Sequence, residues 1–192
     1  MPRLFTALEI PQSAALSLSL LRGGVPGARW IDRENFHITL RFIGDVDHRT
    51  ADEVIEAFDR VRRQQFELSL SGTGFFGSKK PHSIWAGVRQ TPALMALQAD
   101  QERICQRMGL PAEPRKFTPH VTLARLKNAR VDDVVHYLTG RGNFEAGPFT
   151  VTRFVLMSSR DSVGGGPYVV EEGYPLDMPI AAKPLRLGEL RV

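Results

Sequence analysis

The chain has 192 residues, of which 25 are Lys or Arg and 21 are Asp or Glu, and 42% are hydrophobic. This size and composition predict one globular domain rather than a disordered chain. The single cysteine excludes an internal disulfide, and no apolar run approaches the ~18 residues of a membrane span. We therefore expect a cytoplasmic protein without a signal peptide or membrane anchor. The net charge of +4 is compatible with an anionic partner but does not identify one.

The first half of the chain is predicted to fold as strand, helix, strand, helix, strand. Hydrophobic patterns favour strands at 3–10, 36–42 and 66–76. A helix is expected at 11–22, because the Gly23-Gly24 pair would end it. Thr50-x-x-Glu53 fits a capping box, so a second, amphipathic helix is expected to begin there.

The second half of the chain repeats this order. Strands are expected at 84–88, 120–126 and 149–159, and helices at 91–108 and 131–138. A Gly-rich turn at 164–167 leads into a further expected strand at 168–171, and residues 177–192 are expected to form an irregular tail.

Equivalent elements of the two halves are separated by 80 to 83 residues, which indicates an internal duplication. We expect a single domain over residues 1–192, made of two similar sequence halves at about 1–80 and 81–176. A pseudo-two-fold axis would relate the halves, and exchange of strands between them stays open.

The pattern H-x-T-L occurs twice, at equivalent places in the two halves, and this repetition is a specific signal. Strand alternation places His37 and Thr39 on one face, about 6.6–6.8 Å apart along the strand. His120 and Thr122 share a face of the second strand in the same way. If the two halves meet, two imidazoles and two hydroxyls converge on one cleft.

Two histidines suit phosphodiester chemistry. One imidazole can be neutral and take a proton from water while the other is protonated and donates to the departing oxygen. Threonine hydroxyls can donate hydrogen bonds to the phosphate oxygens. No step needs a metal, and the chain lacks closely spaced His or Cys ligand pairs, so we expect neither a metal nor a cofactor. The remaining histidines have no partner motif and receive no role: His48, His82 and His136.

With these motifs, the chain resembles the two-histidine (2H) phosphoesterases, and within them the RNA 2′,3′-cyclic phosphodiesterases once named 2′-5′ RNA ligases. The resemblance covers the chain from Leu4 to about Tyr174. Its supporting context comprises Arg29-Trp30, Asn35-Phe36-His37-Ile38-Thr39-Leu40-Arg41-Phe42-Ile43-Gly44, Phe117-Thr118-Pro119-His120-Val121-Thr122-Leu123-Ala124-Arg125, and the segment from Ser158 to Val169 around Tyr168.

The resemblance implies a bilobal α+β fold, with an antiparallel sheet and helices in each lobe and the active cleft between the lobes. It implies a substrate of RNA or a nucleotide that ends in a 2′,3′-cyclic phosphate, which is hydrolysed to a 2′-phosphomonoester. His37 is implied as the proton donor to the 3′ oxygen and His120 as the proton acceptor, although pseudo-symmetry makes the reverse chemically possible. Thr39 and Thr122 match the phosphate-holding positions of the family.

Two arginines compete for a further role in the cleft. Arg125 matches the arginine that follows the second motif in the family and is implied to contact phosphate. Strict alternation would place Arg125 on the face opposite His120, so this role requires a bulge or a strand end there. The same alternation places Arg41 on the face of His37, which makes Arg41 a candidate substrate contact.

Aromatic and basic residues near the motifs are candidates for binding RNA. Five basic residues and no acidic one lie between Arg115 and Arg130, which could form an approach for the RNA backbone. Aromatic rings could stack on the terminal base, and the candidates are Trp30, Phe75, Phe76 and Tyr168. Because Phe75 and Phe76 are adjacent in a strand, one of them is expected in the core.

Three functions fit these observations. The first is a hydrolase: a metal-independent RNA 2′,3′-cyclic 3′-phosphodiesterase that uses a two-histidine general acid and base. The second is ATP-independent 2′-5′ RNA ligation by the same site. The third is a non-catalytic RNA-binding module, which leaves the paired histidines unexplained. The expected partner is RNA or a nucleotide with a 2′,3′-cyclic phosphate end, with no membrane and no obligate protein partner.

Overall fold

The computed structural model of the chain describes residues 3–159 and 167–178. Along this part of the chain the elements follow in the order β1 (Arg3–Glu9), α1 (Gln12–Ser19), β2 (Ala28–Trp30), the short 3-10 helix η1 (Arg33–Asn35), β3 (His37–Asp45), α2 (His48–Phe58), β4 (Phe66–Phe76), β5 (Ser83–Val88), α3 (Pro92–Arg107), β6 (His120–Leu126), α4 (Val131–Thr139), β7 (Glu145–Val151), β8 (Arg153–Ser159) and β9 (Tyr168–Pro175). The expected strands at 66–76 and 120–126 are confirmed.

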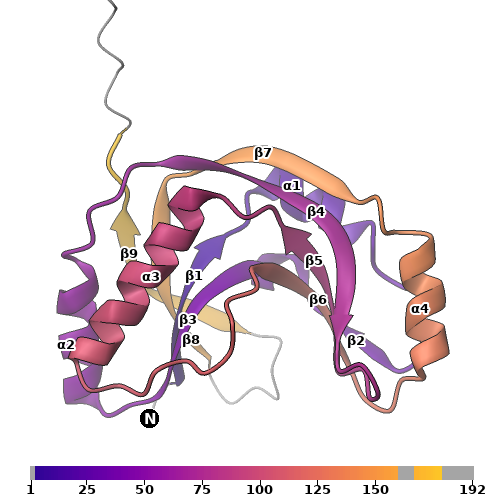
Figure 1. The fold of residues 1–192 in the computed structure, drawn as a ribbon, viewed down its shortest axis with the longest axis horizontal. Coiled ribbons are helices and arrows are strands. Elements are labelled where there is room, and N and C mark those ends of the chain that lie inside the picture. The colour runs from indigo at the N-terminus through magenta and orange to yellow at the C-terminus, as the bar shows by residue number, and fades with distance from the viewer. Residues whose placement is uncertain (1–2, 160–166, 179–192) are drawn as a thin grey trace, which may run out of the picture.

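The strands form one strongly curved, nine-stranded antiparallel sheet in the order β7-β4-β5-β6-β3-β1-β8-β9, with β2 paired to β6. Figure 1 shows the sheet as an arch, with α2 and α3 at one end and α4 at the other. The α+β fold with antiparallel strands is therefore confirmed. The sheet consists of two half-sheets, β7-β4-β5-β6 with β2, and β3-β1-β8-β9. In the described part of the chain they are joined through β3 and β6, at the single registered pair Ile38 and Val121.

Each half-sheet combines strands from both halves of the sequence. β4 belongs to the first sequence half but pairs with β5 and β7, whereas β8 and β9 belong to the second half but extend the sheet from β1. The strand exchange that the sequence left open is thus present. As a result, β3 and β6 lie at the centre of the sheet, and each carries one H-x-T-L motif.

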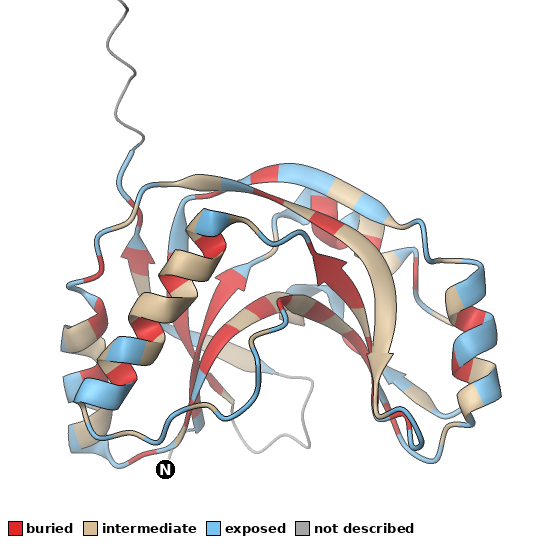
Figure 2. Cartoon of the chain, in the orientation of Figure 1, coloured by how far each residue is buried: buried red, intermediate tan, exposed pale blue. Residues whose placement is uncertain are grey.

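Apolar side chains between the helices and the sheet form the main core. Val54 and Phe58 of α2 are fully buried, as are Leu94 and Leu97 of α3, so both helices are held by their apolar faces. Figure 2 shows buried residues along the central strands and on the helix faces that are turned toward them. No helix in the described part of the chain is long and apolar enough to span a membrane.

The predicted capping box at Thr50 is wrong. Helix α2 begins at His48, because the Asp47 carboxylate accepts a hydrogen bond from the Thr50 backbone N–H at 2.7 Å and so caps the helix three residues earlier. Glu53 does not reach back to the helix start but pairs with Arg49 one turn before it, at 3.0 Å.

The single strand expected at 149–159 is also wrong, because β7 and β8 are separate strands that belong to different half-sheets. The chain crosses between the half-sheets at Thr152 without a Gly or Pro to mark the change. Strand β2 has only three residues and was not expected. The Gly-rich turn predicted at 164–167 lies, except for Pro167, outside the described residues, as does the predicted tail beyond residue 178.

Candidate active site

The contact between β3 and β6 brings the two H-x-T-L motifs together. Ile38 pairs with Val121 in an antiparallel register, which places His37 beside Thr122 and Thr39 beside His120. All four of these side chains line one cavity of about 290 Å³. The convergence expected from the sequence is therefore present in the fold.

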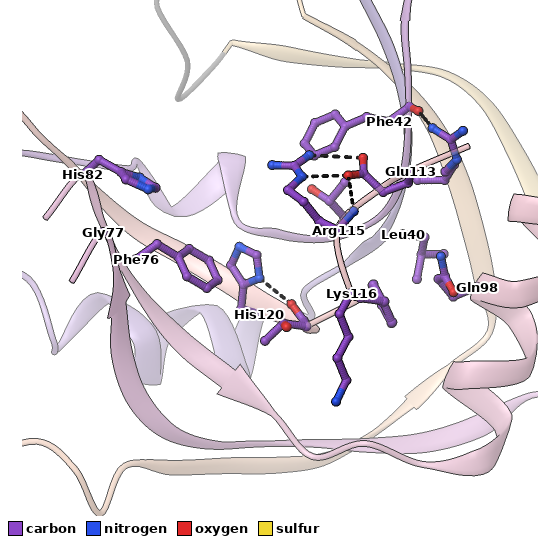
Figure 3. A pocket seen from close by; sticks show the side chains of 14 residues that line it. Leu40, Phe42, Phe76, Gly77, His82, Gln98, Glu113, Arg115, Lys116 and His120 are labelled. Atoms are coloured by element: carbon purple, nitrogen blue, oxygen red, sulfur yellow. Dashed lines mark hydrogen bonds and ion pairs between the residues drawn. The ribbon is translucent and has the colours of Figure 1, made fainter. Parts of the chain in front are cut away.

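Each histidine is oriented by an equivalent hydrogen bond from its ring to the backbone. Nδ1 of His37 lies 2.8 Å from the backbone oxygen of Asn35. Nδ1 of His120 lies 2.7 Å from the backbone oxygen of Thr118 (Figure 3). A carbonyl oxygen can only accept a hydrogen bond, so Nδ1 carries the hydrogen in both rings. Each neutral imidazole therefore keeps an unprotonated Nε2 that can take up a proton.

Two aromatic rings hold the imidazole of His37. Its centroid lies 5.1 Å from the Phe5 ring and 4.9 Å from the Tyr168 ring, which meets it edge to face. The backbone N–H of Tyr168 also donates to the side-chain oxygen of Asn35 at 3.3 Å. The start of β9 is thus bound to the residue that orients His37. Tyr168, a candidate substrate contact, lines the cavity.

His120 has an equivalent pair of aromatic neighbours. The Phe76 ring meets it edge to face at 4.9 Å, and the Trp85 ring lies 6.2 Å away. Phe76 lines the cavity, whereas the adjacent Phe75 packs against the main core, so the expected division between these two residues is confirmed. Trp30 was a stacking candidate, but it packs on Tyr137 at 5.7 Å and does not line the cavity.

A β-bulge follows the threonine in each motif. In the pairing of β1 with β3, Leu40 is an extra residue, and in the pairing of β5 with β6, Leu123 is the extra residue. Such a bulge reverses the alternation of every residue after it. The residues just beyond each motif therefore face the opposite way from the prediction of strict alternation, up to a second extra residue of β3 at Ile43.

The bulge at Leu123 turns Arg125 toward the cavity, where it lies on the same face as His120 and Thr122. A bulge at this place is what a contact between Arg125 and the phosphate required in the sequence analysis. Among the described residues, no carboxylate pairs with Arg125, and its side chain is exposed to the cavity. Arg125 can therefore offer its full charge and its planar array of donors to an anion.

The bulge at Leu40 turns Arg41 away from His37, so the prediction that these residues share a face is wrong. Arg41 is 6% exposed and forms an ion pair with Glu102 of α3. Its guanidinium also donates to the backbone oxygens of Phe42 and Pro111. With these partners, Arg41 joins β3 to α3 and to the loop before β6. It lines a neighbouring cavity of about 440 Å³, but its charge there is already paired with Glu102.

The surroundings of both histidines favour the neutral form. Burial is the main cause that lowers the pKa of His37 to about 4, and the nearby charges of His120 and Arg125 contribute to this shift. Burial also lowers the pKa of His120, with an additional contribution from Arg125. A phosphate anion between the rings would oppose both effects, because an anion favours the charged imidazolium.

Some of the basic residues between Arg115 and Arg130 are paired with carboxylates. Arg115 lines the cavity but pairs with Glu113 at 2.7 Å, and Arg130 pairs weakly with Asp132 at 3.7 Å. Lys116 lines the neighbouring cavity of Figure 3 and has no acidic partner in the described part of the chain.

Several residues that contact the two histidines were not predicted from the sequence. Asn35 orients His37, and Phe5 packs on it, while Trp85 packs beside His120. The 80-residue offset relates Phe5 to Trp85, so the duplication could have indicated both. In the described part of the chain, no three His, Cys, Asp or Glu side chains cluster as they would to hold a metal ion.

Comparisons with known proteins agree with this geometry. The model of the 2′-5′ RNA ligase superfamily matches residues 10–162. An RNA 2′,3′-cyclic phosphodiesterase of Aeropyrum pernix is 38% identical over 149 residues, which cover 76% of this chain and 84% of the relative. A protein of the same name from Aquifex aeolicus is 32% identical and covers 76% and 81% of the two chains.

Solved structures show the same fold. Escherichia coli LigT in complex with 3′-AMP superposes with a TM-score of 0.74 at 25% identity, covering 92% of this chain and 99% of LigT. A protein of Thermus thermophilus shares the fold with a TM-score of 0.75 at 22% identity, covering 93% of this chain and all of the other. From the family match, the relatives and the paired motifs together, this chain belongs to the 2′-5′ RNA ligase superfamily, whose members are 2H phosphoesterases.

Proposed function

We propose that this chain is an RNA 2′,3′-cyclic phosphodiesterase that hydrolyses 2′,3′-cyclic phosphate ends to 2′-phosphomonoesters without a metal. The observation that carries the proposal is the convergence of His37 and His120 on one cavity, each with Nδ1 bound to a backbone oxygen. The relatives named RNA 2′,3′-cyclic phosphodiesterase support the substrate class, and so does the 3′-AMP in the LigT complex.

In the proposed reaction, the cyclic phosphate lies between the two imidazoles. Nε2 of His120 takes a proton from a water molecule as the water oxygen bonds to phosphorus. Nε2 of His37, protonated, donates to the 3′ oxygen as its bond to phosphorus breaks. The products are a 3′-hydroxyl and a 2′-phosphate, and the two histidines exchange their protonation states through solvent before the next turnover.

The hydroxyls of Thr39 and Thr122 and the guanidinium of Arg125 would hold the non-bridging oxygens of the phosphate. Charge on these oxygens rises in the pentavalent transition state, so fixed donors there lower the barrier. The acid, the base and the donors are all supplied by side chains, and for this reason no step of the proposal uses a metal.

Substrate binding itself would prepare the acid. The lowered pKa keeps His37 neutral near pH 7, whereas the general acid must be protonated. A bound phosphate anion raises the pKa of the adjacent imidazoles and so favours proton uptake on binding. The enzyme would then carry its catalytic proton mainly when substrate is present.

Phosphorus NMR of a 2′,3′-cyclic dinucleotide with the protein in excess EDTA tests the proposal. We expect conversion to the 2′-phosphate only, and a loss of about 10²–10⁴-fold in rate for His37→Ala and for His120→Ala. His136→Ala, at an exposed position of α4, is the matched control and should retain full activity. Full activity in either cleft variant, or a reaction that EDTA abolishes, would refute the mechanism.

The equivalent placement of the two imidazoles also suits 2′-5′ ligation, in which a ribose 5′-hydroxyl replaces water as the nucleophile. One imidazole takes the proton of this hydroxyl as its oxygen bonds to phosphorus, and the other donates a proton to the 3′ oxygen as that bond breaks, which leaves a 2′-5′ linkage. RNA halves with 2′,3′-cyclic and 5′-hydroxyl ends, assayed for a 2′-5′ linkage without ATP, would detect this reaction.

A further inference from the structure

A second cavity of about 440 Å³ opens beside the catalytic one (Figure 3). The two cavities are continuous, because the same residues line both: Thr39, Phe42, Phe76, His82, Arg115 and His120. The second cavity then extends away from the histidines, between Gln98 of α3 and the loop at 113–118. A nucleotide held at the histidines would therefore have a direct path into this space.

The second cavity is lined by two arginines whose charges are already paired, Arg115 with Glu113 and Arg41 with Glu102. The proposed function uses Thr39, Thr122 and Arg125 of the catalytic cavity for the reacting phosphate. The second cavity adds Lys116, which has no acidic partner in the part of the chain that the structure describes. A cation in this position suits a second phosphate group, and phosphate contacts of this kind position a nucleic acid regardless of its sequence.

The second cavity also presents an apolar ring. Phe42 is 45% exposed, lines both cavities and lies 5.9 Å from the Phe5 ring. By the 83-residue offset, Phe42 occupies the place of Arg125, so the duplication has produced a cationic wall on one side of the cleft and an aromatic wall on the other. An exposed ring beside a cationic groove is the arrangement on which bases of single-stranded RNA stack.

We propose that the second cavity binds the nucleotide that precedes the cyclic-phosphate end, with its base against Phe42 and its phosphodiester near Lys116. This inference rests on the proposed function and adds to it a binding site for the nucleotide before the RNA end. Gln98 supplies amide donors and acceptors on the far wall, which can pair with the edge of that base.

A comparison of two substrates tests the contribution of the second cavity to the reaction. Adenosine 2′,3′-cyclic phosphate fills only the catalytic cavity, whereas adenylyl-(3′-5′)-adenosine 2′,3′-cyclic phosphate would fill both. We expect kcat/KM to be about tenfold or more higher for the dinucleotide, the order that one base stacking contact provides. Lys116→Ala and Gln98→Ala should bring this ratio toward one. Lys127→Ala, an exposed lysine outside both cavities, is the control and should preserve it.

The outcomes are distinguishable from failure of the proposed function. A wild-type ratio near one, or a ratio unchanged in both variants, would overturn the inference while leaving the hydrolysis intact. Equal losses on both substrates would place the terminal nucleotide in the second cavity and also overturn it. If neither substrate is turned over, the proposed function fails, and calorimetry with the 2′-phosphates of adenosine and of the dinucleotide still tests the cavity. The dinucleotide should then bind more tightly, and Lys116→Ala should remove the difference.

Discussion

Ile38 and Val121 form the only registered pair between the two half-sheets in the described part of the chain, and both side chains are fully buried. They are also the second residues of the two H-x-T-L motifs. Their contact therefore sets the separation of His37 and His120 directly. The hydrophobic residue inside each motif has a positioning role, because it fixes two catalytic strands against each other.

The first prediction concerns this contact. Ile38→Ala should lower the free energy of unfolding by about 2–5 kcal/mol, through lost burial and the cavity left behind. Leu94→Ala, at an equally buried site on α3, should cost a similar amount. We expect kcat, measured where both variants are folded, to fall much further for Ile38→Ala. Equal kcat values would show that the pair contributes to stability alone.

The sequence predicted the central features of the site because they depend on local patterns. Alternation within His37 to Leu40 and His120 to Leu123 is unbroken, so the faces of the histidines and threonines followed from strand geometry. The duplication then predicted that the motifs are equivalent. Neither inference required knowledge of the partner strand.

The features that sequence reasoning missed depend on neighbouring strands. Each bulge is an extra residue relative to the paired strand, so the sequence of β3 alone cannot reveal that Arg41 turns away. The same limit explains the missed break at Thr152, where β7 and β8 change partners without a turn residue. At α2, two capping residues compete within four positions, and Asp47 prevails over Thr50.

The second prediction concerns Arg125. Arg125→Met should lower kcat/KM by about 10²–10³-fold, the loss found when one donor to a developing oxyanion is removed. The pKa of both histidines should rise, because the Arg125 charge lowers them in the native protein. NMR titration of the ring protons measures this shift. Arg125→Lys keeps the charge and should leave the pKa values near those of the native protein while still binding phosphate less well.

The third prediction concerns the pH dependence of the two kinetic constants. kcat/KM reports the free enzyme, in which burial lowers the pKa of both histidines, that of His37 to about 4. The form with one proton on the pair is then most populated below pH 6.5, so the kcat/KM profile should have its maximum there. The acidic and basic limbs of this profile report apparent pKa values of the coupled pair His37 and His120, and not of one ring.

In the complex, the phosphate anion raises both pKa values, so the bell-shaped profile of kcat should lie at higher pH than that of kcat/KM. Both profiles can be measured with the same cyclic dinucleotide at constant ionic strength. Coincident profiles, or a kcat maximum on the acidic side, would contradict proton uptake on substrate binding.

The fourth prediction assigns the acid and the base. When sulfur replaces the 3′ bridging oxygen of the cyclic phosphate, the thiolate leaves without protonation, so a general acid is no longer needed. His37→Ala should then recover most of its lost rate relative to the native enzyme, whereas His120→Ala should not. Recovery by His120→Ala in place of His37→Ala would reverse the two roles.

The fifth prediction concerns Arg41, whose guanidinium is paired with Glu102 in the interior. Arg41→Met leaves the Glu102 carboxylate, 18% exposed, without its cation, so the free energy of unfolding should fall by about 3–5 kcal/mol. Urea denaturation measures this loss. Arg49→Ala removes the exposed pair with Glu53 and should cost no more than about 1 kcal/mol.

The double variant Arg41→Met/Glu102→Leu distinguishes the interior role from a substrate contact. It removes both charges, so most of the lost stability should return, because the main penalty in the single variant is the unpaired carboxylate. Activity should return with it, since the loop before β6 again packs against a satisfied interior. If Arg41 bound the phosphate instead, kcat/KM would stay low in the double variant however stable it became.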